Sequence, residues 1–136
     1  MIVLLDTNVI MDALQERAPF DISAKEILLR GQSGEISCMF TANAATDIFY
    51  LYGKARGASI ANKALDFLLH TYCVVSITQE DCLCALTHPI TDFEDALVAV
   101  SAEKIKADYI ITRDEKFLNE TLNKKIISPS MFITLL

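Results

Sequence analysis

The sequence predicts an α/β fold with three layers, in which helices cover both faces of a central parallel sheet of four to five strands. Short aliphatic runs that end at polar residues alternate along the chain with segments of helical spacing. Uninterrupted apolar runs are typical of strands buried on both faces, and their alternation with helices favours right-handed crossovers and a parallel sheet. Neither a repeat nor a low-complexity segment interrupts this pattern, so we interpret residues 1–136 as one domain.

Two strand ends carry the polar residues that matter most. The aliphatic run Ile2–Leu5 stops at Asp6-Thr7-Asn8, and a later run, 109–111, stops at Thr112-Arg113-Asp114. Ligands of open α/β sheets bind outside the carboxyl ends of the strands. If the two strands are parallel neighbours, Asp6 and Asp114 lie at the same edge, where like charges repel unless something neutralises them. We expect a divalent metal ion in that role.

The remaining elements follow from apolar spacing and from Gly, Pro and capping residues. Further strands are expected at 36–40, 73–77 and 124–128. Helices are expected at 9–14 with Thr7 or Asn8 as the cap, 21–30, 41–53 with Thr41 as the cap, 58–70 and 78–87, and residues 129–136 form a closing helix or tail.

The segment 91–102 is the most informative helix. Thr91 with Glu94 three residues on has the spacing of a capping box, and the helix dipole alone accounts for acids such as Asp92 and Glu94 in a first turn. Asp95 differs from them because small residues follow it at helical spacing and let the helix approach a sheet closely. Asp92 lies three residues before Asp95 and shares its face. The small residues are Ala96, Ala99 and Ala102.

Asp47 stands within the predicted helix 41–53 among apolar residues. Burying a carboxylate among apolar side chains costs free energy unless the carboxylate is paired with a cation or bound to a metal ion. The alternative interpretation is an exposed acid on the outer stripe of an amphipathic helix. The sequence leaves the two interpretations equal.

Composition and charge limit the class of protein. The hydrophobic fraction of 52% indicates a large core, and no apolar run approaches the ~20 residues of a membrane span. The N-terminus has a strand pattern rather than a secretion signal, so we expect a cytoplasmic protein that does not associate with a membrane. The four cysteines lack zinc-site spacing, and we expect them to be buried free thiols. A net charge of −6 counts against a protein that binds nucleic acid through an overall positive electrostatic potential. It does not exclude an enzyme that acts on nucleic acid.

The predicted fold allows Asp6, Asp95 and Asp114 to converge at one strand edge, with Asp47 as a possible fourth member. Oxygen ligands are those that Mg²⁺ and Mn²⁺ prefer, and zinc is disfavoured because no His or Cys has a place in this set. His88, in a predicted loop, is a weaker candidate for a general base.

The order of these motifs resembles the PIN domain family over nearly the full chain. The motifs are Asp6-Thr7-Asn8 after the first strand, Asp47 in a central helix, Asp92-Phe93-Glu94-Asp95-Ala96 opening a helix, and Thr112-Arg113-Asp114 after a strand. The resemblance implies an endoribonuclease, dependent on Mg²⁺ or Mn²⁺, that cleaves single-stranded RNA with metal-activated water and leaves a 5′-phosphate and a 3′-hydroxyl.

The same resemblance implies the roles of single residues and the partners. Asp6, Asp95 and Asp114 would be metal ligands and Asp47 a further catalytic acid, although the family usually has Glu at that helical position. The supporting residues would be Asn8 and Thr112 as hydrogen-bonding groups and Asp92 as an outer acid at the mouth of the site. Many small prokaryotic members are toxins of toxin–antitoxin pairs, which implies a small antitoxin protein as partner and a homodimer.

Two other hypotheses remain. A catalytically degenerate PIN-fold module would bind a protein partner, but a degenerate site should have lost one or more of its acids. A phosphatase of the haloacid dehalogenase type also has an Asp after its first strand, but its chemistry requires a second Asp two residues later, where Asn8 stands.

Overall fold

The computed structural model describes residues 1–120 and 125–136, and its strands form one parallel sheet. The sheet has the order β3-β2-β1-β4-β5, and each pair of neighbours runs parallel. This confirms the predicted α/β fold. Lys124, predicted to begin the last strand, lies outside the described residues. The strands are β1 (Ile2–Leu5), β2 (Ser37–Thr41), β3 (Cys73–Val75), β4 (Tyr109–Ile111) and β5 (Ile126–Ile127).

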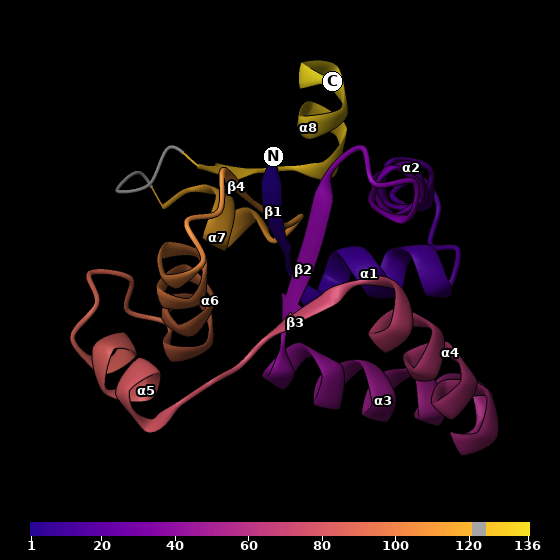
Figure 1. Cartoon of the computed structure of the whole chain (residues 1–136), viewed down its shortest axis with the longest axis horizontal. Coiled ribbons are helices and arrows are strands. Elements are labelled where there is room, and N and C mark those ends of the chain that lie inside the picture. Colours follow the sequence, from indigo (N-terminus) through magenta and orange to yellow (C-terminus); the bar gives the residue numbers. More distant parts are fainter. Residues whose placement is uncertain (121–124) are drawn as a thin grey trace.

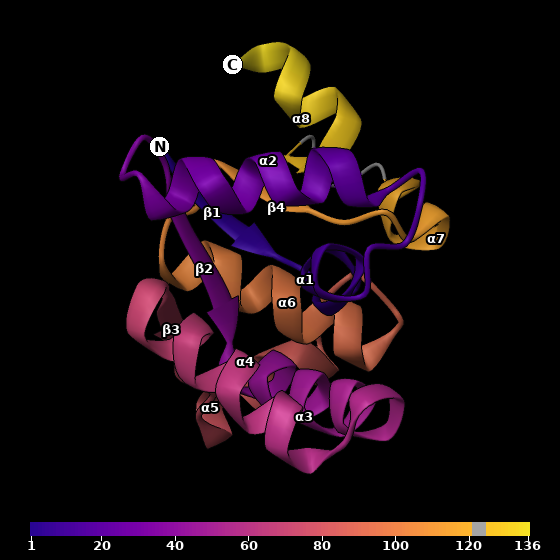
Figure 2. The same cartoon turned by 90° about the vertical axis from the view of Figure 1, so that its right-hand side faces the viewer.

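Helices cover both faces of the sheet, as Figures 1 and 2 show. One face carries α1 (Thr7–Leu14), α2 (Asp21–Gln32), α3 (Ala42–Arg56) and α4 (Ala58–Thr71), and the other carries α5 (Gln79–Leu86) and α6 (Phe93–Lys104). The short helix α7 (Glu115–Leu118), which follows β4, was not predicted. The closing helix α8 (Pro129–Leu135) packs against α2.

The core explains why the central strand is uniformly apolar. Val3 and Leu5 belong to the cluster packed under α1 to α4, whereas Leu4 belongs to the cluster under α5 and α6. All three side chains are 2% exposed or less, because successive strand residues point to opposite faces and both faces are covered. Ala96 and Ala99 of α6 are fully buried, in keeping with the predicted close approach of that helix.

Two predicted helix caps were wrong by one or two residues. Asp6, rather than Thr7 or Asn8, caps α1, because the chain is still extended at Asp6 when it leaves β1 and its carboxylate accepts a hydrogen bond from the backbone N–H of Thr7. Asp92, rather than Thr91, caps α6 by accepting a hydrogen bond from the N–H of Asp95. Both corrections concern acids of the candidate site. Thr41 caps α3 as predicted.

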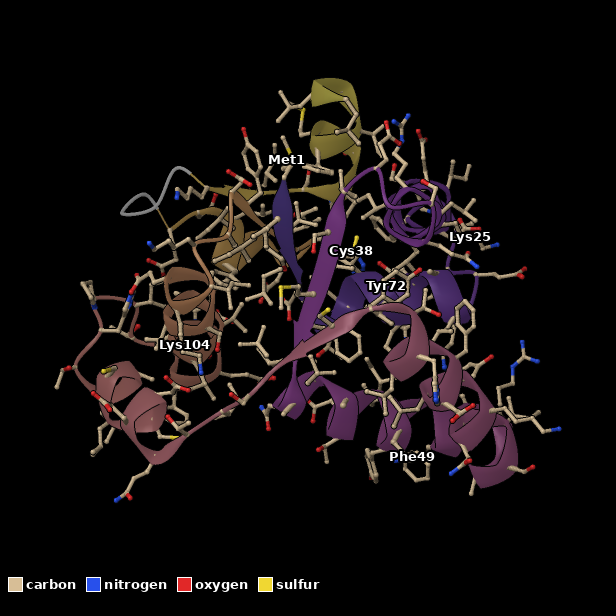
Figure 3. All side chains as sticks on the ribbon, viewed as in Figure 1. Met1, Lys25, Cys38, Phe49, Tyr72 and Lys104 are labelled. Atoms are coloured by element: carbon tan, nitrogen blue, oxygen red, sulfur yellow. The ribbon has the colours of Figure 1, made fainter. Side chains whose placement is uncertain are left out.

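All four cysteines have free thiols, but they differ in burial. Cys38 is buried on the same side of β2 as Tyr72 (Figure 3), and this burial raises its pKa to about 12. Cys73 and Cys84 are exposed, so the prediction of buried thiols was wrong for them.

Of the helices in the described part of the chain, none combines the length and the apolar character that crossing a bilayer would require.

Candidate active site

Four of the predicted acids meet at the carboxyl edge of the sheet. Leu5 of β1 pairs with Ile111 of β4, and the N–H of Asp6 donates to the carbonyl oxygen of Ile111 over 2.9 Å. The two strand ends are therefore neighbours, as predicted. A cleft of about 270 Å³ opens beside them. The acids that line it are Asp6, Asp47, Glu94, Asp95 and Asp114.

Asp6 stands at the base of the cleft with a fixed carboxylate. The N–H of Thr7 donates to its Oδ1 over 2.8 Å, and the hydroxyl of Thr112 donates to its Oδ2 over 2.8 Å. The side-chain amide of Asn8 donates to the same Oδ2 over a longer 3.4 Å. These bonds hold the orientation of the carboxylate before any ligand binds.

Thr112 joins the two strand ends through one hydroxyl group. Besides donating to Asp6, its Oγ1 accepts hydrogen bonds from Nδ2 of Asn8 (3.2 Å) and from the N–H of Asp114 (3.1 Å). A hydroxyl has one donor and two acceptor positions, so this group is fully used. The Asn8 oxygen in turn accepts from the N–H of Arg113 over 3.3 Å. The predicted supporting residues, Asn8 and Thr112, therefore lie where they can orient Asp6.

The helix N-termini place the other acids. Asp95 stands in the first turn of α6, and its N–H donates to Oδ1 of Asp92 over 3.0 Å. Asp92 thus supports the backbone of Asp95 and is not among the described residues that line the cleft. Asp114 caps α7 by accepting from the N–H of Lys116, and its side chain remains exposed at the mouth.

Asp47 of α3 faces the cleft rather than the outer surface. It is half-buried, and with Asp6 and Glu94 it also lines a narrow recess of about 10 Å³, close to the volume that a single water molecule requires. Sequence reasoning missed Glu94, because the helix dipole already explained an acid there. A signal was present, since Leu97 and Val98 stand three and four residues later, share its helical face and line the same recess.

Burial and mutual repulsion raise the pKa values of three of these acids. Burial, followed by the charges of Asp92, Asp6, Asp114 and Glu94, raises the pKa of Asp95 to about 7. Burial is also the main cause that raises the pKa of Asp6, against hydrogen bonds from Thr112 and Thr7 that lower it, and Asp114 and Asp47 raise it further. The pKa of Glu94 is raised by burial and by Asp47 and Asp6. The cleft therefore carries more negative charge than it can stabilise alone.

The donor set fits a hard divalent cation. All five acids offer carboxylate oxygens, and a cation among them would relieve the repulsion that contributes to the raised pKa values of Asp6, Glu94 and Asp95. As the side chains stand, no group of three or more His, Cys, Asp or Glu residues in the described ranges is arranged to hold a metal ion. An oxygen-only donor set of this kind can hold a hard divalent cation through one or two carboxylates and several waters.

A family model described as the PIN domain matches residues 2–116. The chain belongs to the PIN domain family. The matched range extends from β1 through the first residues of α7 and includes every acid of the cleft. A comparison with curated proteins gives no match.

Solved structures share this PIN fold at low sequence identity. VapBC2 from Rickettsia felis, bound to a DNA fragment from its promoter, gives a TM-score of 0.69 at 17% identity and covers 94% of this chain and 98% of its own. A toxin–antitoxin complex from Klebsiella pneumoniae gives 0.70 at 18% identity, with 93% and 97% covered. VapC20 from Mycobacterium tuberculosis, a toxin that cleaves the sarcin–ricin loop, gives 0.70 at 16% identity, with 88% and 95% covered. At these identities the likeness concerns the fold.

His88 has no place in the cleft of this PIN domain. Its Nε2 lies 3.2 Å from a carboxylate oxygen of Glu103, near the end of α6 opposite to Asp95, and its Nδ1 accepts from the N–H of Ile90. It is absent from the described residues that line the cleft. The geometry gives no support to a general-base role.

Proposed function

We propose that this PIN-domain chain is a divalent-metal-dependent endoribonuclease that cleaves single-stranded RNA and leaves a 5′-phosphate and a 3′-hydroxyl, and that it acts as the toxin of a toxin–antitoxin pair. The observation that carries the proposal is the cleft at the carboxyl edge, where five carboxylates gather and where burial and neighbouring charges raise the pKa values of Asp6, Glu94 and Asp95. Such a cleft needs a cation, and membership of the PIN family supports nuclease chemistry. One domain spanning residues 1–136 would carry this activity.

In this proposal Asp6, Asp95 and Asp114 hold one Mg²⁺ or Mn²⁺ ion, directly or through its waters. When bound, such an ion stabilises charge that develops on a phosphate and makes water a stronger nucleophile. Asn8 and Thr112 keep the Asp6 carboxylate oriented toward the cleft. Asp92 keeps the first turn of α6, and with it Asp95, in position.

Asp47 orients or deprotonates the attacking water. Its support is the narrow recess that it shares with Asp6 and Glu94, which has about the volume of one water molecule. Asp47 is one methylene shorter than the glutamate usual in the family, and Glu94 adds a third carboxylate to the recess beside Asp6 and Asp47. Asp95 is the alternative to Asp47 for orienting or deprotonating the attacking water.

The proposed partners take their support from the structures that share the fold. The Klebsiella pneumoniae neighbour is a toxin–antitoxin complex, and we propose a small antitoxin protein as partner of this chain, with a homodimer as its own assembly. Large apolar side chains exposed on α3 and α4 support a protein-binding surface, and Phe49 projects from the outer side of α3 (Figure 3).

We propose a cytoplasmic site of action, where RNA is available. A short upstream gene for a DNA-binding protein would support the pairing, and sedimentation would test the homodimer.

The experiment that tests the function combines metal binding with cleavage. Purified protein is titrated with Mn²⁺ by calorimetry and then incubated with single-stranded RNA, with end-group analysis of the products. We expect saturable binding and products with 5′-phosphate ends, both lost in Asp6→Asn. Absence of both in the wild-type protein would favour the alternative of a degenerate PIN-fold module that binds a protein partner.

A further inference from the structure

A second charged cluster lies beside the acidic cleft, and it contains one carboxylate and two arginines. Asp12 of α1 is fully buried, and Arg113 pairs with both of its oxygens, through Nε to Oδ2 and through Nη2 to Oδ1 over 3.0 Å. Arg17 approaches the same carboxylate less closely, with Nη1 3.6 Å from Oδ1. The three groups together carry a net charge of +1, so one arginine charge is left uncompensated within the cluster.

The geometry assigns that excess charge to Arg17. The Arg113 guanidinium makes both short contacts with Asp12 and lies over the ring of Phe20, with its Cζ 4.3 Å from the ring centroid. Among the described contacts, the guanidinium of Arg17 donates one hydrogen bond, from Nε to Oε1 of Gln15 over 2.8 Å. An arginine has five N–H donors, so most of those of Arg17 remain available to a ligand.

Arg17 lines the same cleft as the acids. Among the described residues that surround this cleft it is the one cation, and its side chain is 39% exposed. Leu51, an exposed residue, contributes apolar surface to the lining, suited to a ribose or a base. A cleft lined by five carboxylates repels a polyanion, so a fixed guanidinium in its wall is the place where a phosphate can be held.

We propose that Arg17 binds a backbone phosphate of the single-stranded RNA next to the one that is cleaved. The proposal deepens the nuclease function and rests on it. Gln15 holds the Arg17 guanidinium at Nε, and the nearby Asp12 carboxylate limits the movement of that guanidinium. The charge of Asp12 is already compensated by Arg113. A guanidinium fixed in this way suits a phosphate, which it can bind through two parallel hydrogen bonds. Arg17 is thus a substrate-binding residue that does not take part in bond breaking.

The test compares Arg17→Gln and Arg17→Lys with a matched loss of charge elsewhere. Lys106 follows α6 at the amino end of the sheet, where the N–H of the nearby Asp108 bonds to the carbonyl oxygen of Ile2. Lys106→Gln therefore removes one positive charge far from the cleft. Because Arg113 still pairs with Asp12 in the Arg17 variants, the buried carboxylate stays compensated and the fold should persist. Thermal unfolding of each variant checks this.

Two measurements are made on each variant. The first is steady-state cleavage of a mixed pool of single-stranded oligoribonucleotides with Mn²⁺, which separates KM from kcat. The second is the Kd for the same labelled pool in an Asp6→Asn background, measured over a range of salt concentrations. The second measurement does not depend on cleavage.

We expect Arg17→Gln to raise KM and Kd about tenfold, in line with the loss of one charge-assisted contact, and to leave kcat within about twofold. The dependence of log K on log salt should become shallower by about 0.7, the value for one phosphate contact on a single strand. Arg17→Lys should recover part of the affinity and most of the salt dependence. Lys106→Gln should match the wild-type protein in KM, Kd and salt dependence.

The outcomes separate this proposal from the proposed function. Wild-type cleavage with an unchanged KM and salt slope in Arg17→Gln overturns the assignment of Arg17 and leaves the nuclease intact. A fall in kcat alone, or an equal effect of Lys106→Gln, also overturns it. If the wild-type protein binds the pool without cleaving it, the nuclease proposal fails while the Kd series still decides the role of Arg17. If the protein neither binds nor cleaves RNA, both proposals fail.

Discussion

Helix α1 and its N-terminal cap carry two carboxylates that are stabilised in different ways. Asp12, in the second turn, is completely buried, and Arg113 and Arg17 surround it. Asp6, at the N-terminal cap, is held by hydrogen bonds from Thr112, Thr7 and Asn8, and its neighbours of like charge are Asp114 and Asp47. Among the residues that the structure describes, arginines pair with Asp12 and no cation pairs with Asp6.

The difference separates a carboxylate whose charge is compensated within the fold from one that has other acids as its charged neighbours. A buried acid with fixed cationic partners belongs to the structure, and removal of its charge leaves those cations without compensation. A buried acid surrounded by other acids has its pKa raised, and this costs stability until a cation binds. Two carboxylates six residues apart in one helix thus have opposite consequences when they are neutralised.

The strongest test of this contrast is Asp6→Asn. The amide cannot replace the anionic carboxylate at a cation site, and substitution of even the groups around a metal ligand typically costs about 10–100-fold in activity. We expect RNA cleavage to fall by about a hundredfold or more while the fold is retained, as measured by initial rates and circular dichroism. Asp108→Asn is the matched control, because Asp108 accepts from the N–H of Ile2 at the opposite edge. Comparable activity in Asp6→Asn and wild type would remove Asp6 from the mechanism.

The reverse result is expected of Asp12→Asn. Loss of this charge leaves the Arg113 guanidinium, which is 31% exposed, without its carboxylate, and breaking a buried pair costs about 3 kcal/mol. We expect the free energy of unfolding in urea to fall by about that amount. Asp66→Asn, which alters an ion pair with His70 on the surface, should leave stability unchanged. Equal stability of Asp12→Asn and wild type would contradict the structural role of Asp12.

Thr112→Val sharpens the comparison by removing hydrogen bonds and leaving every charge in place. The isosteric valine takes away the donor to Asp6 and the acceptor for Asn8 and Asp114. We expect cleavage to fall about tenfold, a usual effect for a group that orients a metal ligand, with a parallel loss of Mn²⁺ affinity by calorimetry. Thr112→Ser keeps the hydroxyl and should retain most of the activity. Equal losses in both variants would show that packing, rather than the hydroxyl, is what matters.

The smallest expected effect concerns stability against pH in the absence of metal. The pKa of Asp95 is raised from 3.8 to about 7, so the folded chain holds its proton more tightly than the unfolded chain does. The associated stability is fully present below pH 3.8 and is lost as pH rises through about 7. Because Asp95 is partly exposed, we expect a loss of about 1 kcal/mol between pH 5 and 7.5 in EDTA, followed by thermal unfolding.

Two controls accompany the pH measurement. Asp95→Asn cannot lose a proton from its side chain, so its stability should depend less on pH over the same range. Mn²⁺ added at pH 7.5 should restore stability to the wild-type protein, because it replaces the lost proton as the source of positive charge. A wild-type stability that rises with pH in EDTA would contradict the raised pKa.

The sequence predicted those parts of the site that depend on local pattern. Strand ends are visible where an aliphatic run meets a polar residue, so Asp6 and Asp114 were correctly placed at one edge. The alanines after Asp95 correctly indicated a helix packed closely on the sheet. Helix α7, only four residues long, gives too short a pattern to predict.

The remainder could not be predicted because it depends on contacts between distant segments. Asp12 and Arg113 are separated by 101 positions, and neither residue type nor spacing marks them as a pair. The cap of α6 is a local feature, but Thr91 and Asp92 are both good caps, and only the backbone conformation decides between them. Because Thr91 was expected to be the cap, Glu94 was interpreted as the second member of its capping box. Glu94 lines the cleft instead.

The bond from Thr112 to Asp6 spans 106 positions and has a consequence for synthesis of the protein. A ribosome makes Asp6 almost at once, but the hydroxyl that orients it emerges only when more than four-fifths of the 136 residues have been translated. Until then β1 also lacks one of its two strand neighbours. Before residue 112 has been made, Asp6 therefore lacks both the hydroxyl that orients its carboxylate and the strand that pairs with β1 beside it.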